Sequence, residues 1–424
     1  MPGYAPLAMP AQSFARFSRR DRRALVAPRL AKPPILTRLA VFGGALALTA
    51  YGAVQMFKVV SIGPITPLEW AMVVLFVITF SWITLSVTAS IVGFVWLLAQ
   101  RGARGKPPCL RERTAVVMPI YNEAPSRVFG SMQAIIEDVE RTGQAHAFDF
   151  FLISDTTDAN VWIAEVRAFL AMRARLPQAR LYYRRRRRNV SRKAGNIADF
   201  VTHWGGAYAH MVVLDADSLM TGDAIVGLTA AMEADPDAGI IQSLPLIVNR
   251  NTMFARLQQF AARIAGPVIA AGLSAWMGRD GNYWGHNAII RTRAFADHCG
   301  LPDLPGKPPF GGHILSHDFI EAGLMLRAGY TVYMLPSLGG SYEESPPSLI
   351  DLAARDRRWC QGNLQHARLI GARSFTLATR QHLANGIMSY LASPLWMAQL
   401  LVGIVLVLQS HYIRPEYFTK EFSL

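Results

Sequence analysis

The sequence predicts an α/β fold in which a mostly parallel sheet domain is flanked by transmembrane and interfacial α-helices. Apolar, strand-like runs alternate with helical stretches between residues 114 and 335, which is typical of a parallel sheet wrapped by helices. Long uncharged segments lie on both sides of this region. Hydrophobic residues make up 51% of the 424-residue chain and charged residues only 17%, a balance too apolar for a wholly soluble protein.

The charge of the chain leaves three kinds of partner open. The 43 Lys and Arg residues against 29 Asp and Glu give a net charge of +14, which suits nucleic acid, anionic lipid or a phosphorylated substrate. Three cysteines, Cys109, Cys299 and Cys360, lie far apart in the sequence. They form neither a zinc motif nor a disulfide framework, which is consistent with a reducing compartment.

The first hundred residues predict an arm and a membrane anchor. Residues 1–38 are rich in Pro and Arg, and Asp21 is their only acidic residue, so we expect a flexible basic arm. Two apolar segments follow, residues 39–57 and 70–100, and each is long enough to cross a bilayer. Together they make residues 39–100 a pair of transmembrane helices.

The basic residues around these helices predict their orientation. Residues 59–69, between the two helices, contain no Lys or Arg, whereas both outer flanks are basic. The second flank carries Arg101, Arg104, Lys106, Arg111 and Arg113. This asymmetry places the amino terminus and the residues after 101 in the cytoplasm. Much of the positive charge is therefore membrane-surface charge rather than a nucleic-acid footprint.

Residues 101–380 are expected to form the cytoplasmic domain. Its candidate strands are residues 114–118, 148–153, 180–183, 211–214, 240–243 and 331–335. Its candidate helices are residues 126–141, 161–175, 194–204 and 224–234. Residues 252–278 are apolar but broken by Arg256, Arg263 and the Gly266-Pro267 pair, which favours helices lying in the membrane interface. Residues 381–424 are expected to form a transmembrane helix, over 383–410, and a tail.

An acidic pair follows the fourth candidate strand. Asp215 and Asp217 come directly after the apolar run 211–214, and side chains at i and i+2 of an extended segment share a face. The carboxyl ends of parallel strands are where open α/β sheets bind ligands. Mg²⁺ or Mn²⁺ bridging a diphosphate would suit two such carboxylates. The alternative is a capped turn in which Asp217 or Ser218 satisfies backbone donors.

Two other strand ends carry polar groups that could bind a nucleotide base and ribose. The first strand leads into Pro119, Tyr121 and Glu123, and the second leads into Asp155. Both places lie at the same edge of the sheet as the acidic pair. Ordinary turn chemistry is the alternative.

A basic segment precedes the third candidate helix. Lys193 opens that helix, and a helix amino terminus with a lysine beside it is a natural phosphate site. Earlier in the same segment five arginines follow one another: Arg184, Arg185, Arg186, Arg187 and Arg188. This run is either a solvated surface loop or a patch for anionic lipid or an acidic protein.

Asp318 near the start of a later helix is a candidate general base, if the fold brings it over a sugar, and otherwise a helix cap. His313, His317 and Glu321 have helical spacing that could suit zinc, but the sequence lacks the H-E-x-x-H pattern.

A basic-aromatic cluster follows at Arg355, Arg358 and Trp359. Arginines can neutralise a departing diphosphate, and an indole can stack on the apolar face of a sugar ring. An interfacial helix beside the membrane is the competing interpretation.

Taken in order, these segments resemble the family-two inverting glycosyltransferases with a GT-A core, of the membrane-embedded processive kind that includes cellulose and hyaluronan synthases. The resemblance covers roughly residues 114–364 and the flanking membrane helices. It rests on Asp215-Ala216-Asp217 as the metal and nucleotide motif, on Lys193-Ala194-Gly195-Asn196 as the donor-phosphate segment, and on Gly285-His286-Asn287 as the acceptor lining.

Two motifs depart from the synthase pattern. Ser316-His317-Asp318 stands where Thr-Glu-Asp is usual, and Arg355 stands where Gln is usual. These departures, together with Ser341-Tyr342-Glu343-Glu344 and Trp359-Cys360-Gln361-Gly362-Asn363, resemble the branch that builds the β-1,2-linked backbone of osmoregulated periplasmic glucans.

The resemblance implies a multi-pass enzyme of the bacterial inner (cytoplasmic) membrane, with UDP-glucose as donor and a growing glucan as acceptor. It implies Asp318 as base, with Gly285, His286 and Trp359 at the acceptor and Asp215 and Asp217 at the metal. It implies nucleotide contacts from Pro119, Tyr121, Glu123, Asp155, Lys193, Asp215, Arg355 and Arg358.

It also suggests an acyl carrier protein as a partner of the arginine run, and several carboxyl-terminal membrane helices where this sequence contains one clear span. Two alternatives remain open. One is a synthase of another β-linked polysaccharide, of the cellulose or hyaluronan type. The other is a non-catalytic, basic membrane anchor that binds nucleic acid or lipid.

Overall fold

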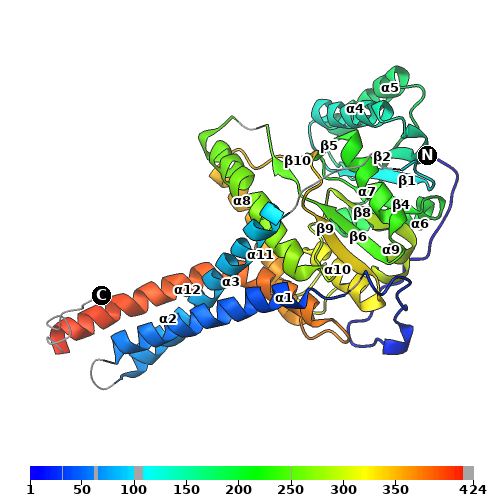
Figure 1. The fold of residues 1–424 in the computed structure, drawn as a ribbon. Coiled ribbons are helices and arrows are strands. Elements are labelled where there is room, and N and C mark those ends of the chain that lie inside the picture. Colours follow the sequence, from blue (N-terminus) through cyan, green and yellow to red (C-terminus); the bar gives the residue numbers. More distant parts are fainter. Residues whose placement is uncertain (31, 62–64, 100–107, 250, 414–424) are drawn as a thin grey trace.

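A sheet domain and a projecting bundle of long helices make up the molecule (Figure 1). The structure is a computed structural model that describes residues 1–30, 32–61, 65–99, 108–249 and 251–413. The bundle consists of α2 (Gly44–Val60), α3 (Pro67–Ala99) and α12 (Leu377–Ile413), with the short α1 (Ile35–Arg38) at its start.

The main sheet has seven strands in the order β3-β2-β1-β4-β8-β6-β9. They are β1 (Thr114–Ile120), β2 (Phe148–Ser154), β3 (Leu181–Arg185), β4 (His210–Val213), β6 (Ala238–Ser243), β8 (Ala288–Arg291) and β9 (Thr331–Leu335). All neighbours are parallel except β8, which is antiparallel to β4 and β6. The predicted mostly parallel α/β sheet is thereby confirmed, with the six predicted strands within two residues of the observed ones.

The β8 strand was not predicted, and its direction matters for the site. Ala288 at its amino end pairs with Val213 at the carboxyl end of β4. The residues that precede β8 therefore lie beside the residues that follow β4. This brings Gly285 and His286 next to Asp215.

Alternate residues of β1 face opposite layers of the core, as the two-residue period of a strand requires. Ala115 and Val117 pack with α6 (Arg192–Trp204), α9 (Thr292–His298) and α10 (His317–Ala328). Val116 and Met118 pack on the other face, where the helices are α4 (Pro125–Arg141), α5 (Ala159–Arg175) and α7 (Gly222–Ala234). Helices on both faces fix the strand ends at one edge of the domain.

A second, three-stranded sheet lies at this edge. Its strands are β5 (Leu219–Met220), β10 (Ser341–Glu343) and β7 (Leu246–Ile247), with β10 in the middle. Because β5 begins two residues after Asp217, its pairing with β10 fixes the turn that carries the acidic pair.

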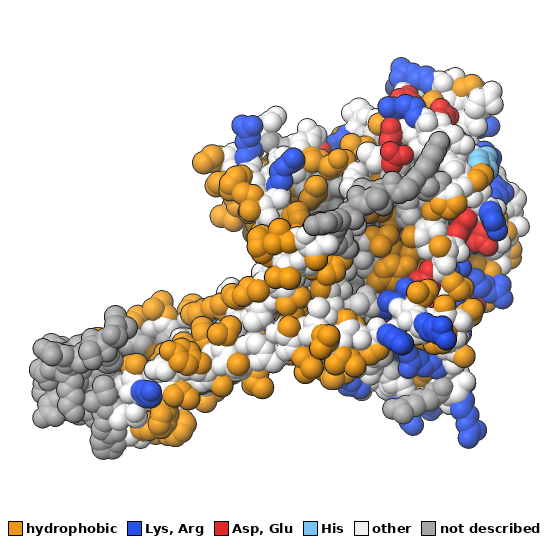
Figure 2. All heavy atoms as spheres, viewed as in Figure 1, with side chains coloured by type: hydrophobic (Ala, Val, Ile, Leu, Met, Phe, Trp, Pro, Cys, Tyr) orange, Lys and Arg blue, Asp and Glu red, His pale blue; other side chains and the backbone are white. Residues whose placement is uncertain are grey.

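Four helices in the described part of the chain are long and apolar enough to cross a membrane: Ile35–Val60, Pro67–Ala99, Met253–Met277 and Leu377–Gln409. Three of them match the predicted spans. Hydrophobic side chains cover the projecting bundle in Figure 2. The basic residues Arg101, Arg104 and Lys106, which helped to predict the orientation, lie outside the described residues.

The remaining helix, Met253–Met277, differs from the prediction. We expected helices broken at Gly266 and Pro267, but α8 (Met253–Met277) is continuous, with Pro267 inside it. One proline removes a single backbone hydrogen bond, which a long helix can tolerate. In Figure 1, α8 diverges from the bundle, so an interfacial location stays a prediction.

The basic arm also differs from expectation. Residues 4–30, here called the N-terminal strap, run along the outside of the sheet domain in fixed contacts. The Asp237 side chain is its main anchor: the carboxylate accepts hydrogen bonds from Arg23 at 2.7 Å and from the backbone N–H groups of Val26 and Ala27 at 2.8 and 2.7 Å. Composition alone had suggested a flexible segment, because it cannot reveal such long-range backbone contacts.

Other strap contacts spread over the whole domain. The Tyr4 ring stacks on Trp204 of α6, with ring centroids 6.0 Å apart. The Gln12 N–H donates to the Gly300 carbonyl at 2.8 Å, and Phe14 packs edge-on against Phe375. The strap thus joins the sheet domain to the first membrane helix.

Candidate active site

The acidic pair follows β4 at the edge of the sheet where the carboxyl ends of the parallel strands meet, and the region around this edge is called the crevice below. The side chain of Asp215 is 38% exposed, and that of Asp217 is also partly exposed. The turn is held locally, because the Asp215 N–H donates to the Ser218 hydroxyl at 2.9 Å. The Ser218 hydroxyl therefore satisfies the backbone N–H of Asp215, so neither carboxylate is needed for this hydrogen bond.

Lys193 links this pair to the turn before β8. Its ammonium group forms an ion pair with Asp215 and donates to the Gly285 carbonyl at 2.7 Å. Lys193 lies in the first turn of α6, directly after Ser191 and Arg192, which adopt left-handed φ angles of 56° and 51°. These two left-handed residues turn the backbone so that α6 begins beside the crevice.

The next residues of the same motif have structural roles. A Cβ atom at Gly195 would lie 2.0 Å from the Val190 carbonyl oxygen, so only glycine allows this close approach. The buried Asn196 amide donates to the Ile153 carbonyl at 2.9 Å and accepts from Arg184 at 2.8 Å. Gly195 and Asn196 thus build the support from which Lys193 reaches the crevice.

The electrostatics of the two aspartates differ. Burial alone would raise the pKa of Asp215, but the positive charge of Lys193 outweighs it and holds this pKa below its ordinary value. Burial raises the pKa of Asp217, and the neighbouring Asp215 charge raises it further. Two adjacent carboxylates of this kind would be stabilised by a cation.

The residues fit a divalent ion only if the substrate contributes ligands. No group of three or more His, Cys, Asp or Glu side chains among the described residues is arranged to hold a metal. Two carboxylates suffice for Mg²⁺ or Mn²⁺ when phosphate oxygens complete the coordination. Asp215 and Asp217 are therefore candidate ligands for a metal–diphosphate complex.

Glu343 is a crevice residue whose role the sequence did not reveal. Its carboxylate lies 3.3 Å from the Nε2 atom of His286. Burial raises the pKa of Glu343, as do the charges of Asp217 and Asp215, while His286 and Arg355 act in the opposite direction. The motif around residue 343 was visible in the sequence, but only the β10 pairing brings it here.

Asp318 lies across the Gly285 turn from Lys193. A Cβ atom placed on Gly285 would lie 3.4 Å from Asp318 Oδ2, so the carboxylate lies against this backbone. The Ser316 hydroxyl donates to Asp318 Oδ1 at 3.0 Å. Because Asp318 is inside α10 and Ser316 is at its N-cap, the helix-cap alternative for Asp318 is wrong.

The zinc alternative is also unsupported by the geometry. His317 pairs with Glu321 at 3.0 Å in the buried interior, whereas His313 lies 2.5 Å from the exposed Asp303. These pairs do not converge on one point.

Helix α11 (Leu349–Leu369) contributes the basic-aromatic cluster. The Arg355 guanidinium lies 4.4 Å from the centroid of the Trp359 ring, which is 52% exposed. Gly362 on the same helix face abuts Ser316, since a Cβ atom there would lie 2.7 Å from the Ser316 nitrogen. Arg358 is exposed, and the described contacts do not join it to the acidic pair.

The predicted nucleotide end is partly occupied by the protein itself. Arg186 forms a bidentate pair with Asp155, with both N···O distances at 2.7 Å. Tyr121 is exposed and its N–H donates to the Glu123 carboxylate. Pro119 is buried inside β1, opposite Ile153.

Three of the five consecutive arginines are committed to internal contacts. Arg184 pairs with Asp199 at 2.5 Å and with Asn196, Arg185 lies 4.8 Å from the centre of the Trp162 ring, and Arg186 holds Asp155. Arg187 and Arg188 remain exposed. The surface patch is therefore smaller than the sequence suggested.

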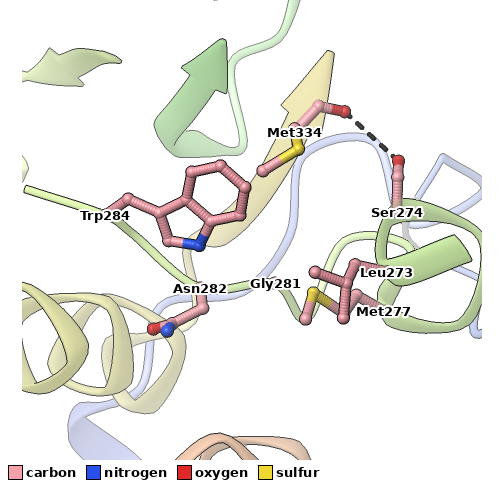
Figure 3. A pocket seen from close by; sticks show the side chains of 7 residues that line it. All are labelled: Leu273, Ser274, Met277, Gly281, Asn282, Trp284 and Met334. Atoms are coloured by element: carbon pink, nitrogen blue, oxygen red, sulfur yellow. Dashed lines mark hydrogen bonds between the residues drawn. The ribbon is translucent and has the colours of Figure 1, made fainter. Parts of the chain in front are cut away.

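A small cavity lies behind the crevice, between α8, β9 and the segment that leads to Gly285 (Figure 3). Its volume is about 10 Å³, and Trp284 and Asn282 line it together with Leu273 and Met277 of α8. This is far too small for a sugar ring and has room for about one water. The cavity therefore belongs to the packing of the turn rather than to a substrate site.

Two family models match the chain, one for glycosyl transferase family 2 over residues 115–299 and one for glycosyl transferase family group 2 over residues 210–419. Together they cover residues 115–419, which include nearly all of the sheet domain and the whole of α12. Residues 115–419 are therefore similar to glycosyl transferases of family 2 and of its family group.

The chain is also similar to glucans biosynthesis glucosyltransferase H. It is 52% identical over 430 residues to this protein of Shewanella sp. (strain ANA-3), and 51% identical over 430 residues to that of Shewanella oneidensis. Each alignment covers 100% of the chain and 59% of the relative. The chain therefore spans about three-fifths of the length of these curated relatives.

A solved structure supports the fold. The mannosyltransferase PcManGT from Pyrobaculum calidifontis, in complex with GDP-Man and Mn²⁺, is 17% identical, with a TM-score of 0.54 over 83% of this chain and 94% of that one. The GT-A-like fold predicted from sequence is confirmed by this similarity.

Proposed function

We propose that this chain is an inverting glucosyltransferase that uses UDP-glucose to extend the β-1,2-linked backbone of osmoregulated periplasmic glucans at the bacterial inner membrane. One observation carries the proposal: Asp318 faces the Gly285 turn from one side, while Lys193 binds that turn and Asp215 from the other. The candidate base and the candidate diphosphate site would thus lie at one turn. The name of the similar relatives supports glucose as the transferred sugar.

The donor would lie along the strand ends. Its uracil would contact Tyr121 and Glu123 near Asp155, and its ribose would lie near Asp215. Asp215 and Asp217 would hold Mg²⁺ or Mn²⁺ against the diphosphate, and the bound ion would neutralise charge on the departing UDP. Arg186 forms an ion pair with Asp155, so the two side chains would line the uracil site together.

The chemistry would need one base and several cations. Asp318 would accept the proton of the acceptor hydroxyl as that oxygen attacks C1 from the face opposite UDP. Lys193 and Arg355 would stabilise the negative charge that builds on the leaving group. A single carboxylate suffices for inversion, because no covalent glycosyl intermediate forms.

The acceptor end would use α11 and the turn before β8. Trp359 would carry the terminal ring of the glucan on its exposed face, with Gly285 and His286 lining the approach. Arg358 would complete the positive charge around the phosphates, if its exposed side chain turns inward when the donor binds.

The direct test is to incubate membranes that contain the chain with radiolabelled UDP-glucose and Mg²⁺, and to analyse the linkages of the product. Asp318→Asn should reduce transfer by about 10²-fold or more while leaving UDP affinity nearly unchanged. Retained turnover in Asp318→Asn would remove this residue from the role of base.

The other outcomes of this test separate the rival functions. Linkages other than β-1,2 would indicate a synthase of the cellulose or hyaluronan type. No consumption of UDP-glucose, together with steeply salt-dependent binding to DNA or liposomes, would indicate a non-catalytic membrane anchor. An acyl carrier protein partner would have to use Arg187 and Arg188, the exposed part of the arginine run.

A further inference from the structure

A second polar hollow lies outside the candidate active site. Its volume is about 640 Å³, and it lies between the N-terminal strap and the connection from α11 to α12. The strap contributes Arg16 and Ser18, and the connection contributes Arg373 and Ser374, with Arg380 from the start of α12. Segments that are more than 350 residues apart in the sequence thus bring three arginines to one space.

The guanidinium groups around this space have donors to spare. Arg16 and Arg373 are exposed, and within the described part of the chain neither side chain belongs to an ion pair. Arg380 donates to the carbonyls of Ile370 and Ala372, which leaves further N–H groups of its five for a ligand. Arg380 is thereby held in place at the hollow.

The hollow is also lined by the hydroxyl groups of Ser18 and Ser374, whereas its described lining contains no carboxylate. The Ser18 hydroxyl accepts from the Arg20 N–H at 3.2 Å, so its own O–H is free to donate. Among the described residues that line the hollow there is no Asp or Glu. The nearby Asp21 carboxylate accepts from the Ser18 backbone N–H at 3.3 Å.

We propose that this hollow binds a phosphate group through Arg16, Arg373 and Arg380. Planar guanidinium groups match phosphate oxygens in bidentate geometry, and an anion would offset the mutual repulsion of three like charges. The volume accommodates a pyrophosphate or the headgroup of an anionic lipid, and both sources present the same chemistry. Figure 2 shows Lys and Arg side chains gathered over the strap on this part of the surface.

A ligand here would hold the strap against the start of α12. The strap leads into α1 and α2, and α12 packs on α3 and α11. Phosphate binding would therefore stabilise the junction between the sheet domain and the membrane helices.

The first arm of the test uses the full chain in neutral detergent with EDTA. Pyrophosphate, compared with chloride at equal ionic strength, should raise the midpoint of thermal unfolding by several degrees, about as expected for a ligand well above its Kd. The Arg16→Gln/Arg373→Gln double variant should lose this shift. Arg175→Gln, an exposed arginine at the end of α5, is the matched control and should keep it.

Two further variants separate this site from the active site and from unfolding. Lys193→Met should keep the pyrophosphate shift, because the donor site is not involved. Arg373→Lys keeps the charge without the bidentate fork and should retain a reduced shift. A shift of equal size in the double variant and the wild type would overturn the proposal.

The second arm replaces pyrophosphate with lipid. The chain is placed in nanodiscs of phosphatidylglycerol or of phosphatidylcholine, and the unfolding midpoints are compared. A gain in phosphatidylglycerol that only the double variant loses identifies a lipid headgroup as the source. The absence of a variant-sensitive shift in both arms would also overturn the proposal.

Discussion

At the scale of single residues, Gly195 decides where Lys193 points. A side chain at Gly195 would collide with the Val190 carbonyl, 2.0 Å from the new Cβ atom, so the entry to α6 would have to move. If the chain transfers glucose as proposed, Gly195→Ala should lower this transfer by about 10²-fold, as misplacement by about 1 Å can do. Gly130→Ala in α4, where a Cβ atom meets nothing within 4 Å, is the control in the same radiolabel assay.

Asp217 supplies a second test at this scale. If it holds the metal, Asp217→Ala should abolish the Mn²⁺-dependent part of UDP binding, because one carboxylate cannot hold the ion and the diphosphate together. Titration calorimetry with UDP, with and without Mn²⁺, measures this part directly. UDP binding that depends on Mn²⁺ to the same extent in the variant would exclude Asp217 as a ligand.

His210 on β4 predicts a loss of stability in acid. Burial, together with the charge of Arg291, lowers its pKa to about 3. A histidine in the unfolded chain titrates near pH ~6.5, so the unfolded state binds the proton first as the pH falls. The stabilisation is therefore complete above pH ~6.5 and is lost progressively toward pH ~3.

The measurement compares free energies of unfolding in detergent at pH 6.5 and 5. His210→Gln should remove about 2 kcal/mol of the decrease over this interval. His203→Gln, on the partly exposed surface of α6, is the control variant in the same measurement. Identical pH profiles for His210→Gln and the wild type would contradict the assignment.

Much of the site could be predicted one residue at a time. Asp215, Asp217, Lys193 and Asp318 stand in motifs or at strand ends, and the structure brings them around one turn. Glu343 could not be placed in this way, because it lies at the crevice through the pairing of β10 with the two-residue strands β5 and β7.

At the scale of elements, the strands and helices of the domain follow from apolar periodicity, whereas β8 does not. Ala288–Arg291 is a four-residue strand whose partners, β4 and β6, are distant in the sequence. The continuity of α8 was also missed, because a Gly-Pro pair usually ends a helix in water. In both elements the observed structure depends on tertiary packing, which the local sequence does not reveal.

That packing predicts a position-specific effect in α8. A Cβ atom at Gly272 would lie 2.1 Å from the Ala89 carbonyl of α3, whereas one at Gly266 would meet nothing within 4 Å. Gly272→Ala should destabilise the chain by about 1–3 kcal/mol through overpacking, while Gly266→Ala should not. Thermal unfolding in detergent distinguishes the two, and equal midpoints would argue against a close α3–α8 contact.

At the scale of the whole molecule, the strap fastens the sheet domain to the membrane helices. Asp237 has a fully buried side chain that accepts from Arg23 and two backbone N–H groups. Asp237→Ala leaves these donors without a partner and should cost about 3 kcal/mol. Trypsin should then cut within residues 16–29 faster than in Asp297→Asn, a change in an exposed ion pair; equal rates would show that Asp237 does not hold the strap.

The strap also has a consequence for biosynthesis. Its residues are translated well before Asp237, Gly300 and Phe375, which it contacts. The helices α2 and α3 follow it in the sequence and are also made before these partners. Phe14 can meet Phe375 only after every strand of the domain has been made. The strap can therefore complete its contacts only after the described strands of the sheet have been translated.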